Sequence, residues 1–304
     1  MVLMFSHGYF NFFLSFLFVL LCQPVISAAQ NQTRPEIKTV SACADPTPLK
    51  FDLMIPKTPA AAAYPAVIVV HGGGWMGGSR KDYQGLQSLL ANMGLASMSI
   101  DYRLAPQARF PAQIEDLKCA IRWLHQHASD HQIDPERIAG FGISAGAHLT
   151  ALAVLTPGKW NDVDRSNQSS DRLRCAVLHA PPLDFPDWWQ TADPQITGTM
   201  SPRFMLNNLI GKDYSQAKSA YKEASPSTYV VHAQKEKTPP LLIIHGEQDV
   251  TVPIRVSQRF IDQLAARGIA AELMRIPDAD HFAFGSQTRQ AVEKIQDFYS
   301  QCLK

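Results

Sequence analysis

The stretch from Ile138 to Leu149 constrains the fold of this chain more than any other part of its sequence. A short apolar run leads into Gly142-Ile-Ser-Ala-Gly146, and small residues that can begin a helix follow. This G-x-S-x-G pattern is typical of a sharp strand-to-helix turn that exposes a serine, and its glycines carry no Cβ atom to collide there. Ser144 is therefore a candidate nucleophile facing the helix amides. A passive serine in a glycine-rich turn also fits this pattern alone.

A second glycine-rich loop follows a strand that we expect to be fully buried. Ala66–Val70 is a continuous apolar run, as in a parallel strand covered on both faces, and it leads into His71-Gly-Gly-Gly-Trp75. Successive glycines let backbone amides approach a ligand closely, and loops of this H-G-G-G type supply oxyanion holes. We therefore expect oxyanion contacts from the amides of Gly73, Gly74 and Ala145. A flexible glycine turn is the plainer alternative.

Nucleophilic serine chemistry also needs a base and a carboxylate that orients the base. Asp249 follows the apolar run Leu241–His245, and His281 follows a strand expected at Ala271–Ile276. The chain order serine, acid, histidine is the one found where the serine stands on a strand-to-helix turn of this kind. We therefore predict a catalytic triad of Ser144, Asp249 and His281.

Other ionisable residues are weaker candidates for these roles. Asp278 and Asp280 crowd the histidine loop and would need a tight reversal to reach His281. His148 lies one helical turn beyond Ser144 and can face the cleft, but packing is the preferred interpretation. The strand-end histidines are expected to be structural hydrogen-bonding residues: His71, His179 and His245. No H-E-x-x-H or C-x-x-C pattern is present, so a metal mechanism has no support in the sequence.

The order of apolar runs predicts an α/β fold with a mostly parallel sheet covered by helices on both faces. Ligand groups of such a sheet gather at the carboxyl ends of its strands, where both glycine-rich loops lie. Residues 30–48 are expected to be a loose lead-in, and Asp134-Pro-Glu136 is expected to begin a short helical step. Strands are expected at 49–55, 66–70, 95–100, 138–141, 175–180, 241–245 and 271–276, and helices at 82–93, 114–124, 256–264 and 287–303.

Residues 184–236 break this alternation of strands and helices. They contain Trp188 and Trp189, several prolines, and a weaker helical pattern over Gln216–Ala224. We interpret the segment as a cap-like insertion that shapes a substrate cleft above the sheet. Trp75, Trp188 and Trp189 are candidate substrate-binding residues, although the aromatic residues of a small cap commonly form its own core.

The 304 residues are 46% hydrophobic, which suits one large domain with a full core. The formal net charge is only +1, so the sequence shows no basic surface of the kind that binds nucleic acid.

Tyr9–Leu21 is almost wholly apolar and leads to Ser27-Ala-Ala29. Residues 1–29 are therefore predicted to be a signal peptide, and 30–304 the mature domain. We expect a secreted or periplasmic protein without stable membrane insertion. Because no Lys or Arg precedes the apolar run, an uncleaved anchor remains an alternative.

Cysteines occur four times in the predicted mature chain, at irregular spacing: Cys43, Cys119, Cys175 and Cys302. Export would permit disulfides, but the spacing does not determine a pairing. We expect Cys119 and Cys175 to be packed thiols.

Together these motifs resemble the α/β-hydrolase superfamily, and within it the hormone-sensitive-lipase-like and feruloyl- and acetylxylan-esterase-like branch. The resemblance covers nearly all of residues 49–303 and implies ester hydrolysis without a cofactor. It implies triad roles for Ser144, Asp249 and His281 and oxyanion roles for Gly73, Gly74 and Ala145. The segments that carry it are 71–75, 101–106, 110–116, 134–138, 142–146, 245–249 and His281.

The sequence departs from this resemblance at two points, and the second bears on the substrate. Ala147 stands where relatives usually have a second glycine, which should not affect the chemistry. The short segment before residue 49 lacks the long N-terminal cap of many lipase-like members. It favours a more open cleft for small-molecule esters with short acyl groups, or for acetyl and feruloyl esters borne on polysaccharide.

Two other functions remain open. An amidase, aryl formamidase or peptidase would apply the same chemistry to another bond. Export argues against a formamidase, and the lack of a propeller-sized domain argues against a prolyl-oligopeptidase-like peptidase. A non-catalytic ligand-binding protein is the third possibility, because some members of this fold bind ligands after losing a triad residue. All three triad positions are filled in this chain.

Overall fold

A computed structural model of the protein describes residues 36–43, 48–58, 62–160, 170–282 and 285–304. The signal peptide predicted for residues 1–29 lies outside these described residues. Within the described ranges, no helix combines the length and the apolar character needed to cross a membrane.

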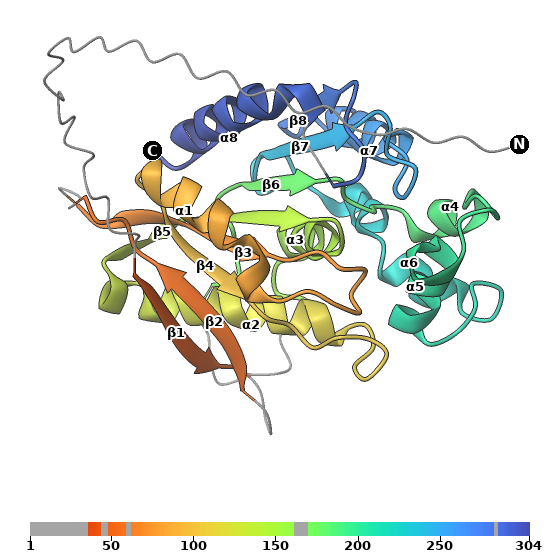
Figure 1. Ribbon diagram of the computed structural model, residues 1–304, viewed down its shortest axis with the longest axis horizontal. Helices are drawn as coiled ribbons and strands as arrows, with labels where there is room; N and C mark the ends of the chain where they lie inside the picture. The colour runs from red at the N-terminus through yellow and green to blue at the C-terminus, as the bar shows by residue number, and fades with distance from the viewer. Residues whose placement is uncertain (1–35, 44–47, 59–61, 161–169, 283–284) are drawn as a thin grey trace, which may run out of the picture. The chain divides into compact units, whose positions relative to one another are not determined.

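An eight-stranded sheet lies at the centre of the fold, with the order β1-β2-β4-β3-β5-β6-β7-β8 (Figure 1). Strands β1 and β2 pair antiparallel, as do β2 and β4, and all pairs from β4 to β8 are parallel. The predicted α/β fold with a mostly parallel sheet is thus confirmed. The strands are β1 Ile37–Ala42, β2 Leu49–Met54, β3 Tyr64–Val70, β4 Ala96–Ile100, β5 Ile133–Ile143, β6 Ala176–His179, β7 Leu241–Gly246 and β8 Ala271–Ile276.

Helices pack against both faces of this sheet. Helices α2 (Ala112–His127), α3 (Ala145–Leu155) and α7 (Arg255–Ala265) contribute to one core, and α1 (Gln84–Asn92) and α8 (Thr288–Cys302) to the other. Successive residues of β3 alternate between the two cores, Ile68 and Val70 entering the first, and Val67 and Val69 the second. Because both faces exclude water, the whole strand is apolar.

The segment between β6 and β7 folds into short helices beside the sheet (Figure 1). Helix α6 (Lys218–Glu223) falls within the weak pattern noted over Gln216–Ala224, whereas the two preceding helices were not expected from the sequence. We call residues 184–236 the cap segment. Its helical parts are α4 Phe185–Gln190, a 3₁₀ turn at Gly198–Met200, α5 Pro202–Ile210, α6, and a 3₁₀ helix at Pro226–His232.

Two local predictions are wrong. Residues 30–48 are not loose throughout, because Ile37–Ala42 forms edge strand β1 and pairs with β2. Asp134 does not start a helical step, because it lies in β5. Its side chain accepts a hydrogen bond from the amide of Glu136 at 2.9 Å and pairs with Arg137 at 2.7 Å. The same capping tendency of aspartate here stabilises an extended segment instead of a helix.

The expectation of packed thiols at Cys119 and Cys175 is also wrong. Cys119 on α2 is bonded to Cys43, which directly follows β1, and Cys175 before β6 is bonded to Cys302 at the end of α8. Both bonds join segments far apart in the chain, with sequence separations of 76 and 127 residues. Each therefore restricts a long loop of the unfolded chain.

Removal of the Cys43–Cys119 bond should destabilise the protein. Closing a loop of this length reduces the entropy of the unfolded chain, so the Cys43→Ser/Cys119→Ser variant should lose about 4 kcal/mol of unfolding free energy. Urea denaturation of the wild type and the variant measures the difference. Reductant should lower the stability of the variant less than that of the wild type, and equal stability without reductant would contradict the prediction.

Candidate active site

Ser144 stands on a strained turn between β5 and α3. Its backbone has φ 52° and ψ −115°, a region that residues with a side chain rarely adopt. A Cβ atom on Gly142 would lie 2.4 Å from the carbonyl oxygen of Gly146, and one on Gly146 would lie 2.1 Å from that of Val70. The turn is also held by the amide of Ser144, which donates to the carbonyl of His179 at 2.8 Å. Glycine is thus required at both flanking positions.

Three predicted site residues are brought together at the ends of β5, β7 and β8. The hydroxyl of Ser144 lies 2.8 Å from Nε2 of His281, and Nδ1 of His281 lies 2.7 Å from Oδ2 of Asp249. The tautomer with a proton on Nδ1 donates to the carboxylate and leaves Nε2 to accept from the serine. His281 and Asp249 are each only 5% exposed, so water screens this arrangement weakly. It has the geometry of a nucleophile, a base and an orienting acid.

Asp249 is fixed by its own loop, which we call the acid loop (residues 247–252). Its Oδ1 accepts hydrogen bonds from the amides of Thr251 at 2.9 Å and Val252 at 2.8 Å, and its Oδ2 contacts Nε2 of His245 at 3.1 Å. Burial by itself raises the pKa of this carboxyl group, but the hydrogen bonds and charges of His245 and His281 outweigh it. The pKa of Asp249 therefore lies well below its usual range, and the group stays ionised.

The two other aspartates near His281 serve the loop itself. Asp278 accepts a hydrogen bond from the amide of Ser286, and Asp280 accepts one from the amide of Phe282, both at 2.8 Å. Neither replaces Asp249 as the partner of His281 in the structure, in agreement with the preference stated from the sequence.

The predicted oxyanion residues lie beside Ser144. Gly73 and Gly74 have φ values of 105° and 60°, and a Cβ atom on Gly73 would lie 2.3 Å from the carbonyl oxygen of Gly77. Ala145 is the first residue of α3, whose amide has no partner within the helix. Among the described residues, no group accepts a hydrogen bond from these three amides. They line one cavity together with Ser144 and can donate to an oxygen bound there. We call residues 71–77 the oxyanion loop.

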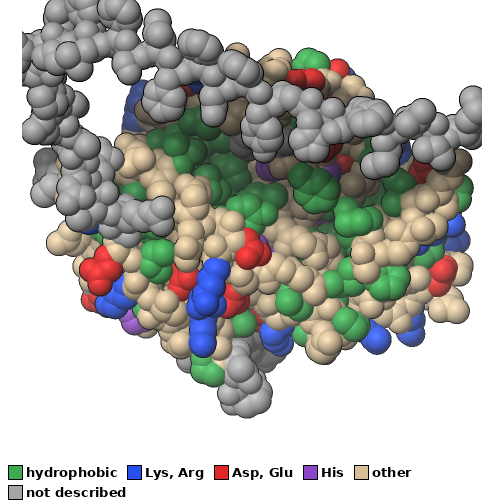
Figure 2. Space-filling view, in the orientation of Figure 1, with side chains coloured by type: hydrophobic (Ala, Val, Ile, Leu, Met, Phe, Trp, Pro, Cys, Tyr) green, Lys and Arg blue, Asp and Glu red, His purple; other side chains and the backbone are tan. Residues whose placement is uncertain are grey.

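A cavity of about 580 Å³ opens above these groups. Figure 2 shows hydrophobic side chains gathered around a hollow on this face, with histidine among them. Trp75 and Trp188 line the cavity, and both are buried. Trp189 does not, because it packs against Tyr214 and Tyr221 in the core of the cap segment. Its candidacy as a substrate-binding residue is therefore not supported by its position.

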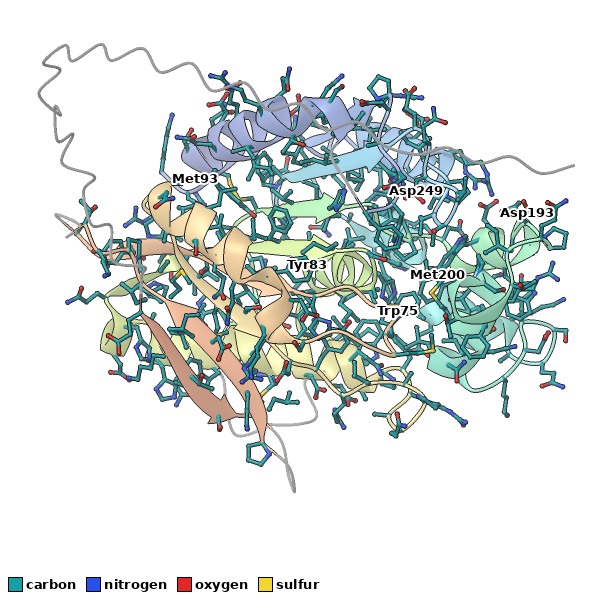
Figure 3. The ribbon with its side chains drawn as sticks, in the orientation of Figure 1. Trp75, Tyr83, Met93, Asp193, Met200 and Asp249 are labelled. Atoms are coloured by element: carbon teal, nitrogen blue, oxygen red, sulfur yellow. A yellow bond between two sulfur atoms is a disulfide. The ribbon has the colours of Figure 1, made fainter. Side chains whose placement is uncertain are left out.

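Several cavity residues were missed by the sequence reasoning. They come from the start of α1, the oxyanion loop, the cap segment and the loop after β8, and in Figure 3 Trp75 lies between Tyr83 and Met200. No spacing or motif distinguishes them, because their side chains meet only in the folded protein. They are Met76, Tyr83, Leu86, Met200, Phe204, Met205 and Phe282.

The remaining histidines act largely as expected. His245 contacts the hydroxyl of Ser257 and the carbonyl of Val252, both at 2.7 Å, and His71 contacts the carbonyl of Gly72 at 2.7 Å. His148 is buried, as the packing interpretation predicts, and His179 lines the cavity.

The chain is similar in sequence to a known protein family and to curated esterases. The BD-FAE family model matches residues 51–264. Esterase LipQ of Mycobacterium tuberculosis is 32% identical over 238 residues, which are 77% of this chain and 54% of LipQ. The chain spans 38% to 54% of the length of LipQ and of two further curated relatives from the same organism, LipM and LipC.

Two solved structures are similar over most of the chain. One is the esterase Est2 of Thermogutta terrifontis with butyrate bound, at 25% identity and a TM-score of 0.71, covering 88% of this chain and 94% of that one. The other is a truncated form of a carbohydrate esterase from gut microbiota, at 26% identity and a TM-score of 0.76, covering 89% and 97%.

Buried histidines should make the stability of this protein sensitive to acid. Burial lowers the pKa of His148 and of His179 to about 3, with the charges of His281 and His245 adding to the effect at His179. An unfolded histidine has a pKa near 6.5, so below this pH the unfolded chain binds protons that the folded protein does not. Stability is fully present above about pH 6.5 and falls as the pH drops toward 3, by up to about 1.4 kcal/mol per pH unit for each histidine.

Urea unfolding of the wild type and His148→Asn at pH 7, 6 and 5 measures this dependence. The variant should lose less unfolding free energy between pH 6 and 5 than the wild type. Equal losses would contradict the assignment of His148 as a histidine that is neutral in the folded protein.

Proposed function

This chain belongs to the BD-FAE family, and from that premise we propose that it is a serine carboxylesterase. The observation that carries the proposal is the line of hydrogen bonds from Asp249 through His281 to Ser144, which ends inside the cavity. The names of LipQ, Est2 and the gut carbohydrate esterase support ester hydrolysis as the reaction class.

The proposed reaction proceeds through an acyl-enzyme. The hydroxyl oxygen of Ser144 attacks the ester carbonyl carbon while Nε2 of His281 accepts its proton, and Asp249 stabilises the resulting imidazolium. The carbonyl oxygen becomes an oxyanion that accepts hydrogen bonds from the oxyanion loop and Ala145. When the ester C–O bond breaks, His281 gives its proton to the leaving alcohol. Water, activated by His281 in the same way, then releases the acid and restores Ser144.

We propose small or aromatic acyl groups, such as acetyl, butyryl or feruloyl, as substrates, on small alcohols or on polysaccharide. The described lining of the cavity contains no Asp, Glu, Lys or Arg, which favours an uncharged, largely apolar group. The structure of Est2 with butyrate bound supports a short acyl group. The carbohydrate esterase from gut microbiota supports an ester borne on carbohydrate.

We further propose that the mature protein acts outside the cytoplasm. The two disulfides support this location, because such bonds persist in oxidising compartments and are rare in the cytosol. The apolar run at Tyr9–Leu21 supplies the export signal in this proposal.

Replacing the nucleophile tests the reaction class. Ser144→Ala should reduce kcat for nitrophenyl butyrate by about 10⁴-fold or more, because no other group can form the acyl-enzyme. Initial rates measure the loss, and Ser300→Ala, a change at an exposed serine of α8, is the control that should retain activity. Undiminished turnover by Ser144→Ala would rule out the proposed mechanism. Methyl ferulate hydrolysis and acetate release from acetylated xylan, assayed in parallel, then identify the acyl and alcohol groups.

Asp249 should matter for rate and not for binding. Asp249→Asn keeps the shape of the side chain but offers the histidine a neutral partner and favours the wrong tautomer, so kcat should fall by about 10⁴-fold while KM changes little. Asp280→Asn is the matched control, because Asp280 is next to His281 in sequence but hydrogen-bonds its own loop. Similar losses in both variants would contradict the assignment of Asp249 as the triad acid.

A further inference from the structure

His148 is a buried ionisable residue that the proposed mechanism does not use. It lies on α3 one turn beyond Ser144, and none of its surface is exposed. Its Nδ1 is 3.2 Å from the indole nitrogen of Trp75, and its Nε2 is 2.6 Å from the carbonyl oxygen of Ala224. The ring stacks on Phe185 with centroids 4.6 Å apart. His148 thus connects the oxyanion loop, through Trp75, to the cap segment, through Ala224 and Phe185.

Only one form of the imidazole satisfies both hydrogen bonds. The indole N–H of Trp75 can only donate, so Nδ1 of His148 must accept, and the carbonyl of Ala224 can only accept, so Nε2 must carry the proton. A second proton, on Nδ1, would place an N–H donor of His148 directly opposite the indole N–H donor of Trp75. Burial keeps the pKa of His148 at about 3, so the neutral ring persists at ordinary pH. Both the orientation and the tautomer of this ring are therefore fixed.

Trp75 is the point at which this ring can act on the oxyanion loop. Trp75 follows Gly74 directly and has φ 60°, a backbone conformation that costs free energy for a residue with a side chain. Its ring is 1% exposed and contacts Phe185 and Trp188 of α4, with centroids 5.3 Å and 6.4 Å away. The surroundings of this indole thus hold the strained backbone next to the amide of Gly74.

We propose that His148 is a positioning residue: by accepting the hydrogen bond of Trp75 and donating to Ala224, it holds the oxyanion loop against the cap segment in the arrangement that stabilises the oxyanion. This inference rests on the proposed esterase function. The consequence is specific, because a displaced oxyanion loop weakens stabilisation of the transition state more than binding of the ester. Loss of His148 should therefore lower kcat with a smaller effect on KM.

Three substitutions separate the two hydrogen bonds. His148→Asn retains an acceptor near the position of Nδ1, His148→Gln retains a donor near that of Nε2, and His148→Phe retains the stacked ring without either. We expect kcat for nitrophenyl butyrate to fall about 10-fold or more in the Phe and Gln variants, as for a small displacement of a catalytic group. The Asn variant keeps the bond to Trp75 but loses the one to Ala224, so it should recover part of the rate. Leu152→Ala, which opens a cavity elsewhere on α3, should lower Tm but leave kcat unchanged.

A double-mutant cycle with Trp75→Phe tests whether His148 acts through Trp75. Once the indole donor is gone, His148→Phe should cost little further rate, because the two changes remove both partners of one hydrogen bond. Additive losses would overturn the proposed route through Trp75. A wild-type kcat in folded His148→Gln would also overturn it. The Gln variant provides this test even if His148→Phe fails to fold.

Activity of the wild type separates failure of this inference from failure of the proposed function. Turnover that is abolished by Ser144→Ala but unaffected in folded His148 variants would overturn the positioning role alone. No Ser144-dependent turnover of any ester by the wild type would contradict the proposed function, and this inference with it. A fall in Tm without a fall in the kcat of the folded His148→Gln protein would assign His148 a structural role only.

Discussion

The geometry of this site depends first on a backbone contact between the start of α3 and the end of β3. Gly146 approaches so closely that a Cβ atom on it would lie 2.1 Å from the carbonyl oxygen of Val70 and 2.5 Å from that of His71. That contact sets the strained turn at Ser144 directly beside the oxyanion loop. The strain at Ser144, with φ 52°, persists because close-packed elements on both sides leave the turn no alternative.

A second glycine contact does the same for the acid and the histidine. A Cβ atom on Gly246, the last residue of β7, would lie 2.2 Å from the carbonyl oxygen of Ala279. The end of β7 and the loop after β8 are therefore in direct backbone contact, and the amide of Gln248 in the acid loop donates to the same carbonyl at 3.0 Å. These contacts place Asp249 and His281 within hydrogen-bonding distance. The parallel sheet brings the strand ends to one edge. The two glycine contacts then fix the loops at that edge closely enough for the three side chains to form hydrogen bonds.

Sequence patterns predicted those features that one strand or one turn determines. Continuous apolar runs located the parallel strands. Ser144, Asp249 and His281 are distant in sequence, but each follows a strand whose carboxyl end lies at one edge of the parallel sheet, so their proximity could be predicted. Features that depend on other distant segments were missed: the pairing of Cys175 with Cys302 follows from the adjacency of β6 and α8, and irregular spacing gives no sign of it. Edge strand β1 has no apolar run because it is only half-buried, and the cavity lining arises from side chains of segments that are far apart in the chain.

The cap segment is linked to both the oxyanion loop and the acid loop, and these links limit which of its residues can be substituted without affecting catalysis. Ala224 reaches the oxyanion loop through His148 and Trp75, while the indole of Trp188 donates to the carbonyl of Thr251 in the acid loop at 2.8 Å. A substitution at one of these buried contacts that reshapes the cavity for another acyl group therefore also acts on the groups that hold the oxyanion loop and the acid. Residues that line the cavity without such hydrogen bonds, at the exposed rim of the cap segment, are free of this coupling. Substitutions at that rim should change substrate preference with little loss of rate, whereas substitutions at the buried contacts should change preference and rate together.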